Sequence, residues 1–487
     1  MKKVLSLTTF IFFILNISIF AFGAETDILD SGYCGAEGDG TNLEWILTRD
    51  NVLTISGKGA MQDYTYNPTT STVNYPWMWK QAMHLIIEDG VTNVGDYAFY
   101  DNYYLRGSIV LPDSIETIGE AAFYNCTGIT SLTLPKNLIK IKDYAFYFCK
   151  NLQGALSIPY GTKEIGYCAF ASCKKLSGDL VIPDTVKKID ISAFVYCEGF
   201  KGNLVLSEGV TEIGRSAFSG CGFTGNLIIP NNVKKIGEEA FKDCSGFSGD
   251  LYLPKGIEVI NDETFSGCSN LKGILVIPDT VTSIGYRAFS GCNFKKDLII
   301  PNSVESIGEY AFAGWTRFNG IIMLPKNITV IEKGTFYNVN VDKVHIPKNV
   351  TKICSDAFSG IYGASNVYFE GNSPNVINAD KSNSSFYKYT KVYYPFGNNS
   401  WVIENDKWNG YTAIAYKLEK DILGDVNKDG KINVLDANLI RRYAAKLIEF
   451  DDEQIIVADV NGDEKINVLD ANLIRRYAAK LVDKFPV

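Results

Sequence analysis

Apolar residues recur along most of the chain with a period of 22 to 24 residues. Between about residues 88 and 363 the phrase P-x-x-V-x-x-I-G-x-x-A-F-x-x-C-x-x-L returns in successive copies. Its phenylalanine marks the twelve copies at Phe99, Phe123, Phe146, Phe170, Phe194, Phe218, Phe241, Phe265, Phe289, Phe312, Phe336 and Phe358. Such a fixed period indicates one supersecondary unit that cannot close its own core. We therefore predict a solenoid of about twelve stacked coils.

Each repeat has two halves with different hydrophobic spacing. A three-residue apolar stretch ends at proline, as Leu180–Ile182 does before Pro183, and this indicates a short strand. Side chains alternate along a strand, so the first and third residues should face the core and the middle one should face outward. In the second half, as in residues 233–241, apolar residues recur every three or four positions. This spacing fits a tight turn or a short helix, and the predicted fold class is α+β.

The outward-facing middle residues of successive strands are apolar or aromatic over a long stretch. If the strands align, these residues form one stripe, and large exposed apolar patches usually mark partner sites. Val and Ile also suit strands in general, so strand propensity alone explains the same pattern. Both explanations remain open. The candidate ligand face consists of Val181, Val205, Ile228, Tyr252, Val276, Ile299 and Met323.

Most of the eleven cysteines follow the repeat. Eight of them come three residues after the periodic phenylalanine: Cys126, Cys149, Cys173, Cys197, Cys221, Cys244, Cys268 and Cys292. Trp315 and Val339 occupy the same slot in later copies, which indicates an apolar packing position. A free cysteine behaves as a small hydrophobe. We predict a ladder of buried thiols, although neighbouring coils would lie close enough for an occasional disulfide.

A stacked solenoid exposes an apolar surface at each end, so the flanking segments are predicted to be caps. Residues 25–87 contain two short apolar runs, Trp45–Thr48 and Val52–Ile55, whose spacing predicts a β-hairpin. Two tryptophans of this cap, Trp77 and Trp79, are expected to pack on the first coil. 

The second cap is predicted at residues 364–418, where the repeat period is lost but strand-like segments remain. Trp401 and Trp408 are expected to close it.

The N-terminus indicates export. Residues 1–24 begin with two lysines, continue with an apolar run and end in small residues, as a cleaved signal peptide does. A retained membrane anchor is the alternative, and no later stretch is long and apolar enough to span a bilayer. The net charge of −8 argues against a nucleic-acid partner.

The C-terminal region, residues 419–487, contains two oxygen-rich loops 34 residues apart. Each has Asp or Asn at loop positions 1, 3, 5, 9 and 12, with a backbone carbonyl available at position 7. This is the EF-hand spacing, in which a loop supplies a hard cation with about six to eight oxygen ligands. We predict two Ca²⁺ sites. The ligands would be Asp425, Asn427, Asp429, Lys431, Asn433 and Asp436 in the first site, and Asp459, Asn461, Asp463, Lys465, Asn467 and Asp470 in the second.

The two loops differ at the sharp turn. The first has Gly430 at this position and the second has Glu464. A side chain at positive φ costs about 1–2 kcal/mol, so we expect weaker calcium binding in the second loop.

An amphipathic helix is predicted after each loop, with no full helix entering it. Residues 431–447 and 465–481 are identical, and this tandem loop–helix pair resembles a type I dockerin. The resemblance implies calcium-dependent docking onto a cohesin module of a cellulosome scaffold. It also implies that positions 10, 11, 17, 18 and 22 contact the cohesin. These positions are Val434, Leu435, Arg441, Arg442 and Lys446 in the first copy, and Val468, Leu469, Arg475, Arg476 and Lys480 in the second.

Identical copies related by a two-fold axis predict that cohesin binds in two orientations. Dockerins often carry Ser-Thr or Ala-Leu at positions 10 and 11, and the Val-Leu found here leaves the choice of cohesin open. 

The repeat phrase and the W-x-L hairpin before it resemble the BspA-type leucine-rich repeats of bacterial surface and secreted proteins. That family implies adhesion or protein recognition and supplies no catalytic residues.

No catalytic site is predicted. A glycosidase needs two carboxylates in a cleft, whereas the acidic residues of the repeats occupy variable, outward positions. His84 and His345 are the only histidines, and His345 is expected on a strand surface. We expect a secreted, extracellular, cellulosome-associated protein that is not an enzyme. Two alternatives remain: a solenoid that binds plant polysaccharide through Tyr252 and Tyr368, and a hydrolase acting in polysaccharide degradation.

Overall fold

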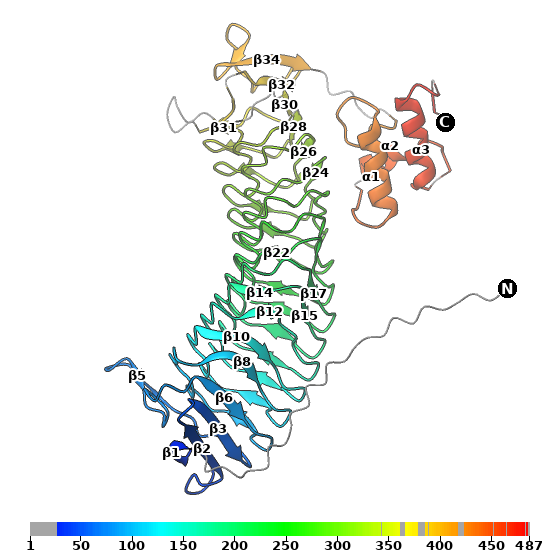
Figure 1. Ribbon diagram of the computed structural model, residues 1–487. Helices are drawn as coiled ribbons and strands as arrows, with labels where there is room; N and C mark the ends of the chain where they lie inside the picture. The colour runs from blue at the N-terminus through cyan, green and yellow to red at the C-terminus, as the bar shows by residue number, and fades with distance from the viewer. Residues whose placement is uncertain are drawn as a thin grey trace, which may run out of the picture.

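A computed structural model describes residues 27–341, 343–360, 366–377, 385–387, 389–416, 423–450, 452–463, 465–482 and 484–485. Figure 1 shows a long, curved stack of coils, with a small helical domain beside its C-terminal part. The predicted boundaries at residues 24, 363 and 418 lie outside the described residues.

A four-stranded sheet closes the N-terminal end, in the order β1-β2-β3-β6. Its strands are β1 (Ile28–Tyr33), β2 (Leu43–Thr48), β3 (Val52–Gly57) and β6 (His84–Ile87). β2 and β3 form the predicted antiparallel hairpin, and β3 pairs in parallel with β6. The sheet of the cap therefore continues directly into the solenoid. A short hairpin, β4 (Tyr66–Asn67) and β5 (Thr72–Val73), projects beside it.

The two tryptophans of this cap behave differently. Trp77 is buried, stacks on Phe99 with ring centroids 5.4 Å apart, and donates a hydrogen bond from Nε1 to the Ala98 carbonyl at 2.9 Å. The predicted packing on the first coil is confirmed for Trp77. It is wrong for Trp79, which is 72% exposed and lies in a turn with a φ of 64°.

Short parallel strands form two ladders along the solenoid. The first ladder, which mostly precedes the prolines, contains β8 (Arg106–Val110), β10 (Gly128–Thr133), β15 (Leu180–Ile182), β17 (Leu204–Leu206), β19 (Leu227–Ile228), β21 (Leu251–Tyr252), β24 (Leu298–Ile299), β26 (Ile321–Met323), β28 (Lys343–Ile346) and β30 (Asn366–Phe369). Two further strands, β12 (Gln153–Ala155) and β14 (Lys175–Ser177), pair with each other slightly earlier in their coils. These strands pair in short groups until β24, where a seven-stranded sheet begins. In β15 the middle residue is exposed and its two neighbours are buried, as predicted.

The second ladder consists of two-residue strands. They are β7 (Asn93–Val94), β9 (Thr117–Ile118), β11 (Lys140–Ile141), β13 (Glu164–Ile165), β16 (Lys188–Ile189), β18 (Glu212–Ile213), β20 (Lys235–Ile236), β22 (Val259–Ile260), β23 (Ser283–Ile284), β25 (Ser306–Ile307), β27 (Val330–Ile331), β29 (Lys352–Ile353) and β31 (Asn375–Val376). Turns follow each of these strands from β7 to β29, so in those coils the second half of the repeat uses the predicted turn and forms no helix.

The periodic phenylalanines form one buried column through the molecule. Neighbouring rings lie 5.0 to 5.7 Å apart, with their planes within 12° of one another. Phe386 continues the column at 5.4 Å from Phe358. The stack is therefore about thirteen turns long, one more than the sequence period indicates. Phe386 escapes the period because it lies 28 residues after Phe358.

The cysteine ladder is confirmed, and it has a polar role that sequence reasoning missed. All eleven cysteines are buried free thiols. Each of the eight periodic thiols donates a hydrogen bond to the phenylalanine carbonyl of the preceding coil, at 3.0 to 3.2 Å. Trp315 makes the same bond through Nε1 at 2.7 Å. The same carbonyls also accept the backbone N–H three residues later, so the side chain in this slot adds a second hydrogen bond to a buried carbonyl as well as filling space.

The C-terminal cap extends the sheet with β32 (Lys391–Pro395), β34 (Tyr411–Tyr416) and β33 (Lys407–Trp408). Trp401 and Trp408 are 6% and 4% exposed and pack on Phe369, as predicted for the residues that close this end.

The helical domain has a hydrophobic core of its own, separate from that of the solenoid. Its helices are α1 (Val434–Ala444), α2 (Asp452–Ala458) and α3 (Val468–Ala478). Helix α2 leads directly into the second loop, so a short entering helix is present there that the sequence analysis did not expect. 

Candidate calcium loops and docking surface

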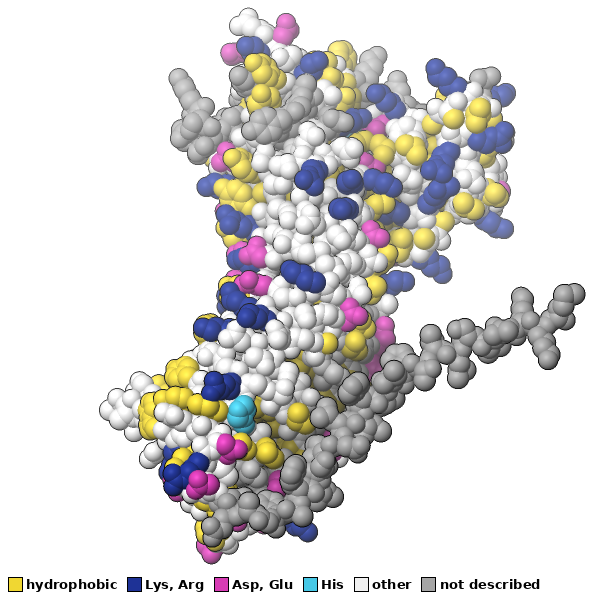
Figure 2. Space-filling model, in the orientation of Figure 1, with side chains coloured by type: hydrophobic (Ala, Val, Ile, Leu, Met, Phe, Trp, Pro, Cys, Tyr) yellow, Lys and Arg dark blue, Asp and Glu magenta, His cyan; other side chains and the backbone are white. Residues whose placement is uncertain are grey.

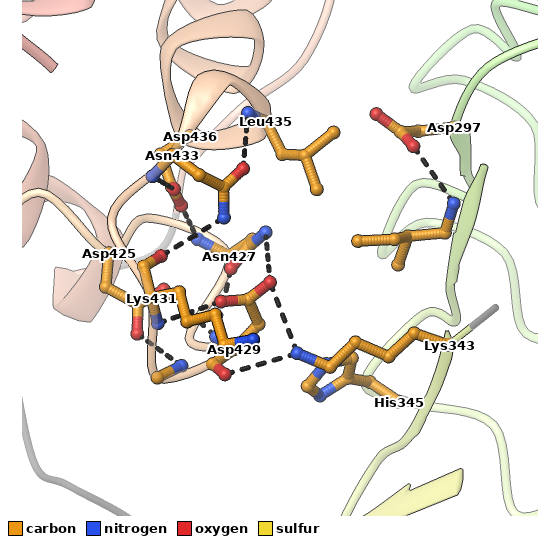
Figure 3. A network of polar contacts seen from close by, with 12 residues as sticks. Asp297, Lys343, His345, Asp425, Asn427, Asp429, Lys431, Asn433, Leu435 and Asp436 are labelled. Carbon is orange, nitrogen blue, oxygen red and sulfur yellow. Dashed lines mark hydrogen bonds and ion pairs between the residues drawn. The ribbon is translucent and has the colours of Figure 1, made fainter. Parts of the chain in front are cut away.

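The first loop, residues 425–436, is closed by hydrogen bonds from its own backbone to its acidic side chains (Figure 3). Asp425 accepts from the backbone N–H groups of Asp429 at 3.0 Å and Gly430 at 2.7 Å. Asp429 accepts from the N–H of Lys431 at 2.9 Å. These bonds wrap the chain around the oxygen atoms of loop positions 1 and 5. Gly430 has a φ of 77°, the conformation that a glycine at the sharp turn permits.

Asp436 joins the end of this loop to helix α1. Its carboxylate accepts from the N–H of Asn427 at 3.0 Å and from that of Asn433 at 2.8 Å. Asn433 is the N-cap of α1 and Asp436 is the third residue of the helix, so together they form a capping box. The same side chains therefore fix the loop and start the helix, a role that the loop motif alone does not indicate.

The surroundings of Asp425 and Asp436 in the first loop disfavour the charged form of these carboxylates. Burial and the nearby Asp429 raise the pKa of Asp425 to about 6, and burial raises the pKa of Asp436 to about 7. Asp436 is fully buried and Asp425 is 4% exposed. Such crowding of buried acidic groups is relieved by a cation.

The second loop repeats this arrangement. Asp470 accepts from the N–H groups of Asn461 at 3.3 Å and Asn467 at 2.9 Å, and Asn467 and Asp470 form the capping box of α3. Asp463 is exposed, whereas the side chain of its counterpart in the first loop, Asp429, is only 4% exposed. Glu464, on which the expected difference in affinity rests, lies outside the described residues.

The donor set of both loops fits a hard cation, because every side-chain donor at the predicted positions is an oxygen. Within the described part of the chain, however, no three His, Cys, Asp or Glu side chains are gathered as a metal site would gather them. In the first loop, Asp425 and Asp436 are both hydrogen-bonded to backbone N–H groups instead.

A lysine from the solenoid faces the first loop. The ammonium group of Lys343, on β28, lies 3.3 Å from Oδ2 of Asp429 and donates to its backbone carbonyl at 3.2 Å (Figure 3). The two side chains are only 13% and 4% exposed. Nothing in the repeat phrase singles out this lysine, so the sequence could not indicate the contact.

The residues predicted to contact cohesin lie on the surface of the helical domain, but the two copies differ in exposure. In the second copy Val468 is 49% and Leu469 is 56% exposed, and the three basic residues are also exposed. In the first copy Val434 and Lys446 are exposed, whereas Leu435 and Arg442 are half-buried. 

Arg441 is half-buried too, and donates to the Asn472 side chain at 3.2 Å, within the domain. Figure 2 shows Lys and Arg side chains gathered on the outer surface of this domain.

The candidate ligand face of the solenoid is divided into two parts. Val181, Val205, Ile228 and Tyr252 are 50%, 44%, 54% and 50% exposed. Val276, Ile299 and Met323 are half-buried, and the last two pack against the core of the helical domain.

His345 was expected on a strand surface, and this prediction is wrong. The side chain is 8% exposed, stacks on Tyr368 with ring centroids 5.2 Å apart, and lines a cavity between the solenoid and the helical domain. Burial and the neighbouring Lys343 lower its pKa to about 4, so the imidazole is neutral at ordinary pH. The helical domain covers this strand, and the repeat pattern does not reveal such long-range burial.

Taken together, a coil stack with a phenylalanine column and a two-loop helical domain define a leucine-rich-repeat protein with a C-terminal docking module. The family BspA type Leucine rich repeat region matches residues 73–201, 163–296, 248–365 and 283–395, and the chain belongs to this family. Residues 423–478 match the family Dockerin type I domain. No curated protein matches the chain.

Solved structures of leucine-rich repeat proteins are similar to the chain. A leucine rich cell surface protein from Faecalibacterium prausnitzii is 23% identical, with 80% of this chain and 95% of that chain covered and a TM-score of 0.42. A leucine-rich repeat protein from Bacteroides ovatus is 17% identical, with 77% and 98% covered and a TM-score of 0.45. One from Eubacterium ventriosum is 22% identical, with 68% and 95% covered and a TM-score of 0.38.

A repeat solenoid joined to a dockerin supports a protein-interaction component of the cellulosome type. Type I dockerins bind calcium, imply a cohesin partner and occur in extracellular cellulosome components. Both matched families are typically non-catalytic. Among the described residues, no helix has the length and apolar character that crossing a membrane requires.

Proposed function

We propose that this chain is a secreted, non-catalytic cellulosome component whose dockerin binds a cohesin module in a calcium-dependent way. The observation that carries the proposal is that the same hydrogen bonds join each loop to the helix after it. In each, an aspartate at position 12 accepts two backbone hydrogen bonds and starts the helix that carries the docking residues. Loop geometry and docking surface are thereby coupled.

Calcium would supply the positive charge that the loops lack. The residues that would hold it are the two six-residue sets predicted from the sequence. The chain's own contribution is to present side-chain oxygens at positions 1, 3 and 5, while the position-12 carboxylate fixes the start of the helix. Without a cation, Asp425 and Asp429 repel each other in a partly buried loop. Loss of calcium should therefore disorder the loop and misplace the helix after it.

The docking surface itself combines an apolar pair with basic residues. In the second copy Val468 and Leu469 expose apolar surface at the start of α3, and Arg475 and Arg476 follow on the last turn of the same helix. Such a surface suits a partner with a small apolar patch bordered by acidic groups.

The test is binding of the full chain to a panel of immobilised type I cohesin modules, with calcium or with a chelator. We expect at least one cohesin to bind in calcium and to release the chain when calcium is removed. The double variant Asp425→Ala and Asp459→Ala should not bind. Its matched control, Asp143→Ala and Asp190→Ala, removes two acidic residues from solenoid turns and should bind normally. Binding that survives chelation, or no binding to any cohesin, would contradict the proposal.

A second function is supported by the open part of the strand face. Val181, Val205, Ile228 and Tyr252 lie on successive coils and are about half exposed, which forms a continuous apolar strip. We propose that this strip binds a protein segment, with adhesion or recognition as its role. 

Ile228→Ser with Tyr252→Ser should abolish capture of the solenoid's partner in a pull-down, whereas Ile86→Ser in the N-terminal cap, which is equally exposed, should not. Affinity electrophoresis on plant polysaccharides tests the glycan alternative. Retardation of the native chain that the double variant loses would favour glycan binding. Release of reducing sugar by the chain would instead favour the hydrolase.

A further inference from the structure

The two dockerin repeats are identical in sequence from residue 431 to 447 and from 465 to 481, but the chain places them in different surroundings. Helix α1 and the first loop lie against the solenoid, and α3 faces away from it (Figure 1). The two repeats can therefore be compared with each other, because any difference in the exposure of identical side chains comes from the rest of the molecule.

The contact has an apolar part. Ile299 on β24 and Met323 on β26 pack against the dockerin core. Both are middle residues of solenoid strands, and they belong to the stripe that the sequence offered as a ligand face. Val276, on the coil before Ile299, is half-buried as well, and the equivalent residues farther toward the N-terminus, Ile228 and Tyr252, remain half exposed. The dockerin of this chain therefore covers the C-terminal end of that stripe.

The contact also has a charged part. Lys343 faces Asp429 of the first loop, with both side chains largely buried. On earlier turns of the solenoid, Asp279 lines the cavities between the solenoid and the helical domain. Burial lowers the pKa of Arg442 on α1, and the carboxylates of Asp279 and Asp297 oppose that shift. Groups of opposite charge thus lie on the two sides of one seam.

Two of the positions expected to contact cohesin fall in this seam. Leu435 is half-buried, whereas its counterpart Leu469 is 56% exposed. Arg442 is half-buried, with Nε and Nη2 buried and without a hydrogen-bond partner, whereas Arg476 is exposed. Figure 3 shows Leu435 at the start of α1, on the side of the loop that faces the solenoid.

We propose that the solenoid is the resident partner of the first dockerin repeat, so that the intact chain offers a cohesin the second repeat alone. The consequence for cohesin binding rests on the proposed function, whereas the contact itself can be tested without a cohesin. Sequence identity predicts two equivalent docking orientations, and the contact removes that equivalence. The chain would be held on its scaffold in one orientation, with the open strip of the solenoid pointing in a fixed direction.

Arginine labelling of the full chain in calcium tests the contact without any cohesin. Phenylglyoxal modifies exposed guanidinium groups, and cleavage before aspartate releases residues 436–450 and 470–482, which differ in mass. Fragmentation then separates Arg442 from Arg441 and Arg476 from Arg475. We expect Arg442 to react several-fold more slowly than Arg476. Equal rates in the native chain would overturn the proposal.

The double variant Ile299→Asp and Met323→Asp should release the repeat and make the two rates equal. The matched control, Val181→Asp with Ile228→Asp, changes the same strand position on coils outside the contact and should leave the rates unequal. If the double variant does not fold, Asp279→Lys, which places a like charge opposite Arg442, replaces it. An unchanged rate ratio in a folded release variant would overturn the proposal.

Cohesin binding adds an independent arm. With a type I cohesin that captures the intact chain, Val468→Asp and Leu469→Asp should cause loss of binding, whereas Val434→Asp and Leu435→Asp should not. In the release variant either pair alone should be tolerated. Loss of binding from the first-repeat pair in the intact chain would overturn the proposal. Failure of every cohesin to bind would count against the proposed function only, since the labelling ratio decides the contact by itself.

Discussion

At the scale of single residues, the cysteine of each repeat is defined by its hydrogen bond as much as by its volume. A thiol three residues after the phenylalanine reaches the phenylalanine carbonyl of the coil before it. Burial raises the pKa of Cys149 and Cys244 to about 12. The reactive form of cysteine is the thiolate, so the ladder combines burial with chemical inertness.

This predicts that iodoacetamide at pH 8 will not modify the eight ladder cysteines in the folded protein. Burial excludes the reagent from all eight thiols, and the raised pKa keeps Cys149 and Cys244 protonated at that pH. Mass spectrometry should show the eight ladder cysteines unmodified in the native protein and fully modified after unfolding in guanidinium chloride. Thiols that become reactive only after reduction would reveal ladder disulfides and contradict the prediction.

At the scale of the elements, the phenylalanine column links every coil to its neighbours. Phe218 is fully buried and stacks on Phe194 and Phe241, with ring centroids 5.6 and 5.5 Å apart. Its removal leaves a cavity that two rigid coils cannot fill.

We predict that Phe218→Ala lowers the free energy of unfolding by about 3–5 kcal/mol, the usual cost of deleting a buried aromatic ring. Urea denaturation followed by tyrosine fluorescence would measure it. The control is Tyr196→Ala, which removes an aromatic side chain that is 53% exposed in the adjacent turn and should cost far less. Equal effects would show that the column does not hold the coils together.

The calcium loops allow a matched exchange between two elements. Gly430 has a φ of 77°, and a Cβ built there meets no atom within 4 Å, so only backbone strain opposes a side chain. Gly430→Glu should weaken calcium binding by the first loop by about 1–2 kcal/mol, roughly 5- to 30-fold. Glu464→Gly should strengthen the second loop by a similar amount. Calorimetric titration of the full chain would resolve the two sites, and no change in either variant would contradict the strain argument.

The sequence predicted those parts of the structure that recur. The period placed twelve of the thirteen members of the aromatic column, and alternation placed Val181 and Ile228 on the surface. Phe386 was missed because it lies 28 residues after Phe358, outside the period of 22 to 24 residues. His345 was placed wrongly because its burial comes from another domain, and a repeat pattern describes only contacts between neighbouring coils.

The loops could also be predicted from local sequence. The positions of their oxygen ligands follow from a local spacing, and the two helices after them are identical in sequence. The capping role of Asn433 and Asp436 was overlooked although the sequence contains it. Lys343 could not be found, since only the folded chain brings it within 3.3 Å of Asp429, 86 residues later.

At the scale of the whole molecule, the described part of the chain forms two hydrophobic cores, and we expect them to need different conditions. The solenoid core contains the aromatic column and depends on no predicted ligand, whereas the dockerin core is built around the two loops. We therefore expect two transitions in a calorimetric melt of the full chain, with only one of them sensitive to calcium.

Removing calcium with a chelator should lower the melting temperature of the dockerin transition and leave that of the solenoid unchanged. A ligand that binds only the folded form stabilises it by about 2.7 kcal/mol at a concentration 100 times its dissociation constant, and the chelator removes that contribution. Asp425→Asn with Asp459→Asn should abolish the sensitivity, because each loop loses the charge at its first position. If the solenoid transition moved as far as the dockerin transition, the metal would be acting on both cores, and a calcium requirement confined to the docking module would be wrong.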